Sequence, residues 1–140
     1  MRILGLDWGE SRIGVAVSDL LGLTAQPVCV ISEKGAALQI EKIIAKATEL
    51  GAEKIVIGMP KNMNGSIGER GEKTQEFVSL LTEKTDLPII YWDERLSSVA
   101  AHRTLAEGQI SGKKRKGIVD KIAAVFILQG YLDSLGGKPL

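Results

Sequence analysis

The chain has 140 residues, a length that fits one ordinary domain built around a single hydrophobic core. Hydrophobic residues make up 44% of it and charged residues 25%, which excludes a disordered or fibrous protein. The formal net charge is only +1, so no global field drives the protein onto nucleic acid or membrane, and any anionic partner must be held by a local patch.

Cysteine usage and hydropathy exclude further classes. Cys29 is the only cysteine, so neither an intramolecular disulfide nor a thiolate metal site is expected. The strand pattern begins at residue 2 and leaves no room for a signal peptide. The longest apolar run, residues 122–128, is far shorter than the roughly 20 residues of a membrane span. We therefore expect a cytoplasmic protein that does not bind membranes.

Three short β-rich runs open the chain. They cover residues 2–7, 12–19 and 26–32. In the second run Ile13, Val15 and Val17 alternate with smaller residues, which is typical of a strand with one larger-residue face. Because the connections between the runs are short, the pattern predicts an antiparallel meander.

The hydrophobic period changes after Gly35. Apolar residues then recur at spacings of three and four, which predicts an amphipathic helix that stops at Gly51. Residues 54–60 form a continuous apolar strand, and a glycine-containing loop leads to a second helix. The predicted inner face of that helix is Phe77, Leu80 and Leu81.

The last third of the chain predicts one strand and two helices. Residues 87–92 read as a strand, residues 97–107 as a helix, 108–117 as a flexible basic loop and 118–135 as a final helix. Helices that alternate with later strands favour an α/β fold with helices flanking a mixed sheet, antiparallel early and parallel late. We expect a single domain over residues 1–140.

Carboxylates occupy three places that packing alone does not favour. Asp7 ends the first strand, Asp93 and Glu94 end the last strand, and Asp120 lies in the first turn of the last helix. Small alanines on the helical face of Asp120 let that helix approach the sheet closely. If the first strand is central, these acids meet at one edge of the sheet.

Clustered carboxylates repel one another unless divalent cations lie between them. Hard oxygen donors without an organised histidine or cysteine set favour Mg²⁺ or Mn²⁺, which can activate a water for phosphodiester hydrolysis. Simpler roles stay open at this point: Asp7 caps a turn, Asp93 or Glu94 pairs with Arg95, and Asp120 is stabilised by the helix dipole.

Four segments in order resemble a known family. They are "GLDWGESRIGVAVSD", "IVIGMPKNMNGSIGERG", "WDERLSS" and "VDKIAAVFILQGYLD". Together they resemble the YqgF family, also called RuvX, whose ribonuclease H-like members are described as nucleases for 5′-end processing of pre-16S rRNA and as Holliday junction resolvases. The resemblance runs from Ile3 to Asp133 and covers nearly the whole chain.

The resemblance implies a ribonuclease H-like fold, a five-stranded sheet with helices on both sides, and metal-dependent hydrolysis of phosphodiester bonds. It also implies one catalytic, metal-binding acid in each of three motifs: Asp7, Glu94 (with Asp93 as the alternative) and Asp120. In many ribonuclease H-like nucleases the second acid lies on another element, such as the fourth strand. Here that strand carries no acid, so the fifth-strand motif must replace it.

Six cations are candidates for contacts with nucleic-acid phosphates: Arg12, Arg70, Lys113, Lys114, Arg115 and Lys116. The alternatives are a solvated basic loop, an ordinary strand-to-helix connection, and pairing of Arg12 with Asp7 or Glu10. Trp8 and Trp92 flank two of the acids, where they stack on bases or simply pack locally.

Three functions are consistent with these patterns. The first is a nuclease with Mg²⁺ or Mn²⁺ that acts on structured RNA in ribosome biogenesis, with a Holliday junction in DNA recombination as the alternative substrate. The second is an actin-like or sugar-kinase-like ATP-binding fold, which the length disfavours because a second lobe is missing. The third is a non-catalytic nucleic-acid-binding assembly factor. Trimming one strand needs only a monomer, whereas resolving a junction needs a symmetric dimer, so we expect a monomer or a weak homodimer.

Overall fold

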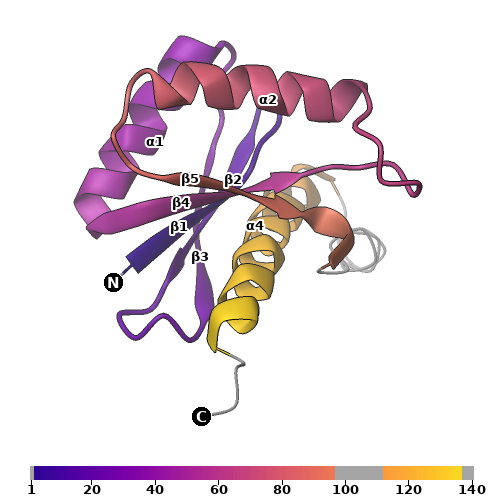
Figure 1. Ribbon diagram of the computed structural model, residues 1–140. Coiled ribbons are helices and arrows are strands. Elements are labelled where there is room, and N and C mark those ends of the chain that lie inside the picture. Colours follow the sequence, from indigo (N-terminus) through magenta and orange to yellow (C-terminus); the bar gives the residue numbers. More distant parts are fainter. Residues whose placement is uncertain (1, 97–111, 137–140) are drawn as a thin grey trace.

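The computed structural model describes residues 2–96 and 112–136, with the side chains of 2–96 and 119–135. Its elements follow in the order β1 (Arg2–Asp7), β2 (Ile13–Ser18), β3 (Ala25–Ile31), α1 (Ala36–Leu50), β4 (Ala52–Met59), α2 (Glu69–Thr82), β5 (Ile89–Asp93), the 3₁₀ turn η1 (Glu94–Leu96) and α4 (Gly112–Gly136) (Figure 1). The helix expected over residues 97–107 lies outside the described residues.

The strands form one five-stranded sheet in the order β3-β2-β1-β4-β5. The pairs β1–β2 and β2–β3 are antiparallel, and the pairs β1–β4 and β4–β5 are parallel. The predicted mixed α/β sheet is therefore confirmed, and β1 lies at its centre, which is the condition under which the acids were expected to meet. Because β1, β4 and β5 run in the same direction, their carboxyl ends reach the same edge of the sheet.

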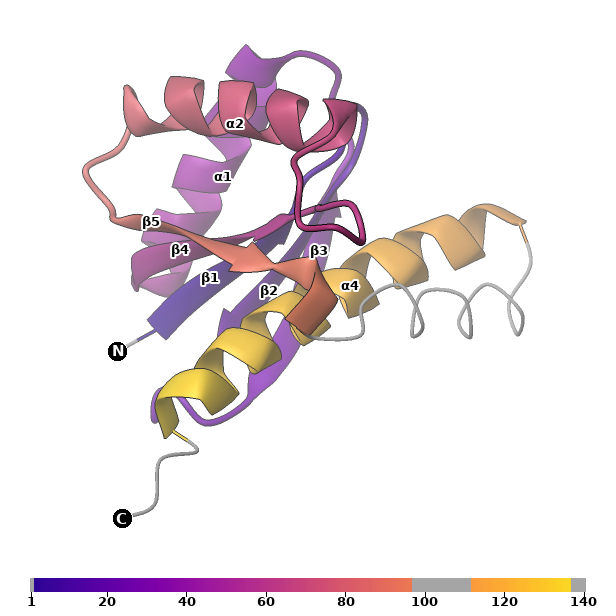
Figure 2. The same cartoon turned by 45° about the vertical axis from the view of Figure 1, so that its right-hand side comes forward.

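Helices cover both faces of the sheet: α1 and α2 lie on one, and α4 crosses the other (Figures 1 and 2). Side chains alternate between the faces along each strand. The α1/α2 face buries a large aliphatic cluster that includes Leu4, Leu6, Ile13, Val15, Ile43, Ile55, Ile57, Phe77 and Leu81. The α4 face buries a smaller cluster that includes Ile3, Ala16, Val56, Ala123, Ala124, Ile127 and Leu128.

Strand glycines allow α4 to lie directly on the sheet. Gly5, Gly14 and Gly58 come from β1, β2 and β4. A Cβ atom on Gly14 would overlap the backbone carbonyl of Asp120, and one on Gly58 would lie 2.5 Å from Cδ1 of Ile127. At Asp120 the backbone of α4 is thus in direct contact with β2, and this contact fixes the position of Asp120.

The last helix begins earlier than the sequence predicted. Residues 112–117, expected as part of a flexible basic loop, are helical, and α4 starts at Gly112. The four consecutive cations Lys-Lys-Arg-Lys are all good helix formers, and no proline interrupts them, so the helix of Asp120 continues toward its amino end. Figure 2 shows this end of α4 projecting beyond the sheet.

The inner face of α2 also differs from its prediction. Phe77 and Leu81 are buried as expected, but Leu80 is 46% exposed. Thr74 and Val78 occupy the buried face instead. Spacings of three and four from Thr74 through Phe77 and Val78 to Leu81 define a single stripe, and Leu80 falls beside it.

Among the described residues, no helix has the length and apolarity that a bilayer crossing requires.

Replacing Gly14 tests the contact between α4 and the sheet. We expect Gly14→Ala to lower the free energy of unfolding by about 3 kcal/mol, because the added methyl group meets backbone that cannot rotate away. Gly22→Ala is the control, since Gly22 has open space around it and only its φ of +73° disfavours a side chain, at a cost of about 1 kcal/mol. Urea denaturation measures both variants, and equal losses would contradict the close contact.

Candidate functional site

Asp7 and Asp120 are neighbours at the carboxyl edge of β1. Asp7 ends that strand, is only 5% exposed, and pairs in register with Gly14 of β2. Ile3 and Gly5 of the same strand face α4, so alternation directs Asp7 to α4 as well. Since the carbonyl of Asp120 lies against Gly14, the two acids meet across a residue that has no side chain.

Arg12 forms an ion pair with Asp120. Its Nε lies 3.0 Å from Oδ2 of Asp120, with side-chain exposures of 40% and 19%. Both atoms are buried, and within the described part of the chain neither has a hydrogen-bond partner, so the contact is an ion pair rather than an aligned hydrogen bond. The sequence left pairing with Asp7 or Glu10 as the alternative to a phosphate contact for Arg12. Asp120 takes this place because α4 brings it over the β1–β2 turn.

The neighbouring acids Asp93 and Glu94 differ in their surroundings. Asp93 accepts hydrogen bonds from the backbone N–H of Arg95 at 3.0 Å and from its Nη2 at 2.7 Å, and Lys61 Nζ lies 4.0 Å away. The hydrogen bond from the Arg95 side chain is the main cause that holds the pKa of Asp93 below its usual value. Asp93 is therefore committed to a local ion pair, one of the simpler roles that the sequence left open.

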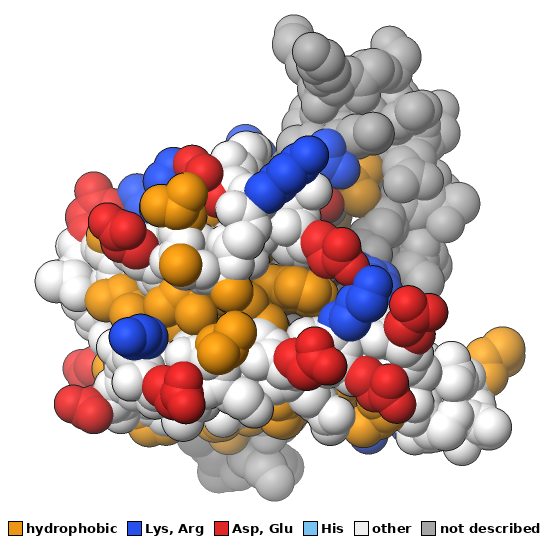
Figure 3. Space-filling model, turned by 90° about the horizontal axis from the view of Figure 1, so that it is seen from above, with side chains coloured by type: hydrophobic (Ala, Val, Ile, Leu, Met, Phe, Trp, Pro, Cys, Tyr) orange, Lys and Arg blue, Asp and Glu red, His pale blue; other side chains and the backbone are white. Residues whose placement is uncertain are grey.

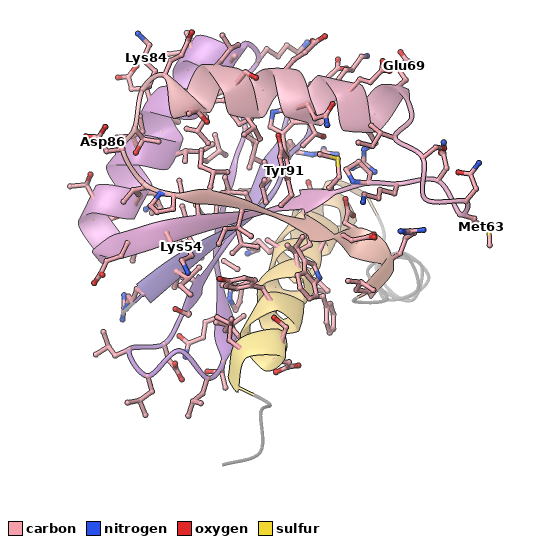
Figure 4. The ribbon with its side chains drawn as sticks, in the orientation of Figure 1. Lys54, Met63, Glu69, Lys84, Asp86 and Tyr91 are labelled. Carbon is pink, nitrogen blue, oxygen red and sulfur yellow. The ribbon has the colours of Figure 1, made fainter. Side chains whose placement is uncertain are left out.

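Glu94 lies on the α4 face of the sheet. Its Cγ would be 3.1 Å from a Cβ atom on Gly58, beside the Ile127 side chain from α4. Alternation along β5 agrees, since Trp92 packs in the α4-side cluster, whereas Tyr91 lies on the α2 side (Figure 4). Asp7, Glu94 and Asp120 thus share one face of the sheet at one edge, and Asp93 lies on the opposite face.

The three acids do not form a closed ligand cluster. Within residues 2–96 and 119–135, no group of three His, Cys, Asp or Glu side chains is close enough to hold a metal ion. The donor set nevertheless fits a hard divalent cation, because all its atoms are carboxylate oxygens. Oδ2 of Asp120 is buried and makes no hydrogen bond among the described residues, but it lies 3.0 Å from Nε of Arg12, so a metal ion at this oxygen would share it with the guanidinium or take its place.

Apart from Arg12, the predicted phosphate-binding cations lie in two places. Lys113, Lys114, Arg115 and Lys116 belong to the first turns of α4, and their side chains lie outside the described ones. Arg70 lies in the first turn of α2 and is exposed. The loop that leads to α2 reaches out at Met63, which is 99% exposed, on the same side of the molecule as Glu69 (Figure 4).

Gln39 was not predicted as a functional residue, although an amide beside Ile40 in the apolar stripe of α1 was a usable signal. Gln39 is 2% exposed, and its Nε2 donates hydrogen bonds to the carbonyl oxygens of Gly9, Glu10 and Glu33 at 2.9–3.2 Å. Its Oε1 accepts one from Nε1 of Trp8 at 3.3 Å. One buried amide therefore fixes the turn that follows Asp7.

Both tryptophans have local packing partners. The Trp8 ring stacks on Phe77 with a centroid distance of 5.4 Å, and the Trp92 ring meets Tyr131 edge-on at 6.2 Å. Local packing, one of the two roles considered for these residues, is thus present at each. The only histidine of the sequence, His102, lies outside the described residues.

A family model described as RuvX, Holliday junction resolvase, matches residues 1–134. The chain belongs to the RuvX family. Its relatives include a Clostridium novyi protein named "Putative pre-16S rRNA nuclease", 53% identical over 135 residues, which are 96% of this chain and all of the relative. A Bacillus pumilus protein with the same name is 48% identical over 137 residues, covering 96% of this chain and 99% of the relative.

Solved structures support the ribonuclease H-like fold of this RuvX-family chain. Thermus thermophilus RuvC in complex with a Holliday junction substrate matches with a TM-score of 0.62 and 12% identity, over 99% of this chain and 97% of the other. The fowlpox virus Holliday junction resolvase matches with a TM-score of 0.55 and 15% identity, over 96% and 99%. The resemblance stated from the sequence is confirmed, and membership of this family sets aside the ATP-binding fold.

Replacing Arg95 tests the assignment of Asp93 to a local ion pair. We expect Arg95→Gln to raise the pKa of Asp93 toward the usual value of about 3.9. A lowered folded-state pKa stabilises the fold above the unfolded-state pKa, and this stability is lost as the pH falls through the folded-state pKa. The decrease in the free energy of unfolding caused by Arg95→Gln should therefore be present at neutral pH and become smaller in acid.

Carboxyl NMR titration measures the pKa of Asp93, and urea unfolding at several pH values measures the stability. Lys61→Gln is the matched control, because its charge is 4.0 Å away and should move the pKa less. An unchanged pKa in Arg95→Gln would contradict the assignment.

Proposed function

We propose that this chain is a metal-dependent nuclease, a single ribonuclease H-like domain over residues 1–140 that hydrolyses phosphodiester bonds during 5′-end processing of pre-16S rRNA. The observation that carries the proposal is the separation of the acids. Asp7, Glu94 and Asp120 face α4 at the carboxyl edge of the sheet, while Asp93 is bound to Arg95 on the other face. The names of the relatives, "Putative pre-16S rRNA nuclease", support the reaction and the RNA substrate.

Asp7, Asp120 and Glu94 are the residues that would hold Mg²⁺ or Mn²⁺ in this proposal. When bound, such ions activate a water and stabilise the leaving oxygen of a phosphodiester. The chain supplies orientation: Asp7 is buried at a strand end, and Asp120 is fixed by backbone contact with Gly14. Carboxylates held on rigid elements keep their geometry without an entropic cost at the moment of reaction.

Arg12 would serve both the acids and the substrate. Its guanidinium lies against Asp120, and 40% of its side chain is exposed at the edge where a phosphate would approach. A planar guanidinium binds carboxylate and phosphate groups alike. Arg70 and the four cations of Lys113–Lys116 would hold the flanking backbone, which makes binding depend on salt concentration through release of counterions.

The Holliday junction is the second candidate substrate. The family model carries that description, and solved resolvases share the fold. Symmetric cleavage of a junction requires two active sites related by a two-fold axis, whereas one active site is enough to trim an RNA end. A monomer with RNA cleavage and a dimer with junction cleavage are therefore the two outcomes to separate.

A cleavage assay with acid variants tests the proposed site. We expect Asp7→Asn, Glu94→Gln and Asp120→Asn each to slow Mn²⁺-dependent cleavage of a labelled pre-16S RNA end by at least about 100-fold, as removal of one electrostatic stabiliser does in other enzymes. Asp93→Asn is the matched control, because it changes the neighbouring carboxylate on the opposite face, and it should retain most of the rate.

The same proteins are tested on a four-way DNA junction, and sedimentation gives the oligomeric state. Faster cleavage of the junction by a dimer would favour the DNA substrate. Equal rates for wild type and Asp7→Asn would contradict the site, and binding without any cleavage would favour the non-catalytic assembly factor.

Metal binding is tested separately from activity. Mn²⁺ should raise the melting temperature of the wild type, because a ligand that binds only the folded state stabilises it by an amount that grows with the logarithm of the free ligand concentration above the Kd. Asp7→Asn and Asp120→Asn should lose most of this shift, and Asp93→Asn should keep it. Chelation with EDTA should reverse the shift and stop cleavage. A shift that all three variants retain would contradict these ligands.

A further inference from the structure

Two adjoining hollows flank the turn after Asp7, on the face of the sheet opposite the acids. The larger, about 650 Å³, lies between the start of α1 and α2, and the smaller, about 330 Å³, reaches the first turns of α2. Trp8, Glu10 and Lys73 line both. We call this pair of hollows the Trp8 groove. Figure 3, which looks onto α1 and α2, shows hydrophobic side chains gathered in a band between charged ones.

The aromatic floor of the Trp8 groove is fixed before any ligand arrives. The Trp8 ring stacks on Phe77 with 29° between the planes, and its Nε1 is held by the buried amide of Gln39. The same amide holds the backbone of Gly9 and Glu10. A ring whose position is fixed on two sides loses little conformational freedom when a ligand stacks on it.

The charges of the larger hollow point to a neutral, flat ligand. The cations Lys34 and Lys73 are matched by the acids Glu10 and Glu76. Lys73 is moreover engaged, with its Nζ 2.7 Å from Glu10, which raises its pKa above the usual value. A phosphate would find no surplus of positive charge here. A nucleobase has no charge and presents a π-face, and aromatic side chains bind bases by stacking.

The position of the groove relates it to the acids. Trp8 directly follows Asp7, and successive residues of an extended chain point to opposite sides. Asp7 faces α4, and Trp8 packs with Phe77 in the cluster under α1 and α2. The groove and the acids therefore flank the end of the same strand from opposite faces of the sheet. A nucleic-acid strand held at the acids that bends around this edge can place a base on Trp8.

We propose that the Trp8 groove binds an unpaired nucleobase of the strand whose phosphate is held at the acids on the other face of the sheet. The inference rests on the proposed function for the nature of the ligand, and it adds a preference for substrates that are single-stranded at the cleavage point. Bases within a helix are stacked on their neighbours and cannot enter the groove without unpairing. The groove thus discriminates by strand structure and not by base identity.

Fluorescence of Trp8 tests the proposal in the full chain. In a Trp92→Phe background Trp8 is the only tryptophan. The probes are an RNA hairpin with a single-stranded 5′ extension of uridines and the same hairpin with a blunt end, both in EDTA so that no cleavage occurs. We expect saturable quenching by the extended hairpin and none by the blunt one. Binding measured by anisotropy should weaken about tenfold in Trp8→Leu.

Two control variants separate stacking from structure. Trp8→Phe keeps an aromatic face and should retain most of the affinity, while Leu38→Ala removes an exposed apolar side chain of α1 that does not line the groove and should have no effect. Melting temperatures confirm that each variant folds. Equal quenching by both hairpins, unchanged affinity in Trp8→Leu, or equal losses in Trp8→Phe and Trp8→Leu would overturn the proposal.

The remaining occupant to exclude is an apolar segment of a partner protein. Anilinonaphthalene sulfonate, a dye that binds apolar surfaces, serves as the probe. If it binds in the groove and the hairpin with the 5′ extension does not displace it, the groove is assigned to such a partner and the nucleobase proposal is overturned. These measurements need no catalysis. A failed nuclease proposal shows as absent cleavage with Trp8 quenching intact, and a failed groove proposal as cleavage without quenching.

Discussion

The backbone contact between α4 and β2 is the constraint that sets the positions of the acids at the carboxyl edge of the sheet. Gly14 has no side chain, and the carbonyl of Asp120 occupies the space that a Cβ atom would take. Gly5 and Gly58 extend the same close approach across β1 and β4. A helix carries its side chains in a fixed direction, so the distance between helix and sheet sets the distance between Asp120 and Asp7. Because Gly14 has no side chain, α4 lies close to the sheet, and this position of the helix places the carboxylate of Asp120.

Alternation along the strands then divides neighbouring residues between two roles. Asp7 faces α4, and Trp8, the next residue, packs beneath α1 and α2. At the end of β5 Asp93 pairs with Arg95, and Glu94, the next residue, lies over Gly58 on the α4 face. The carboxyl edge therefore carries acids on one face and an aromatic groove on the other.

Local pairing, rather than net charge, determines the electrostatics of this edge. Arg12 lies against Asp120, and Lys73 lies against Glu10, each from a different part of the chain. A formal net charge of +1 is therefore compatible with both an acidic centre and cations placed around it. Under the proposed function the cations guide phosphates to the acids, and the neutral groove accepts a base, so that backbone and base are recognised by different surfaces.

The sequence by itself determined the order of the elements, the mixed sheet that is antiparallel early and parallel late, and the family. These depend on periodicity, on stops such as Gly51 and on ordered motifs, all of which are local in the chain. Only the tertiary structure decided the partner of Arg12, the separation of Asp93 from Glu94 and the role of Gln39. Each of these needs contacts between segments distant in sequence, and spacing along one strand or helix carries no information about which neighbour lies across the gap.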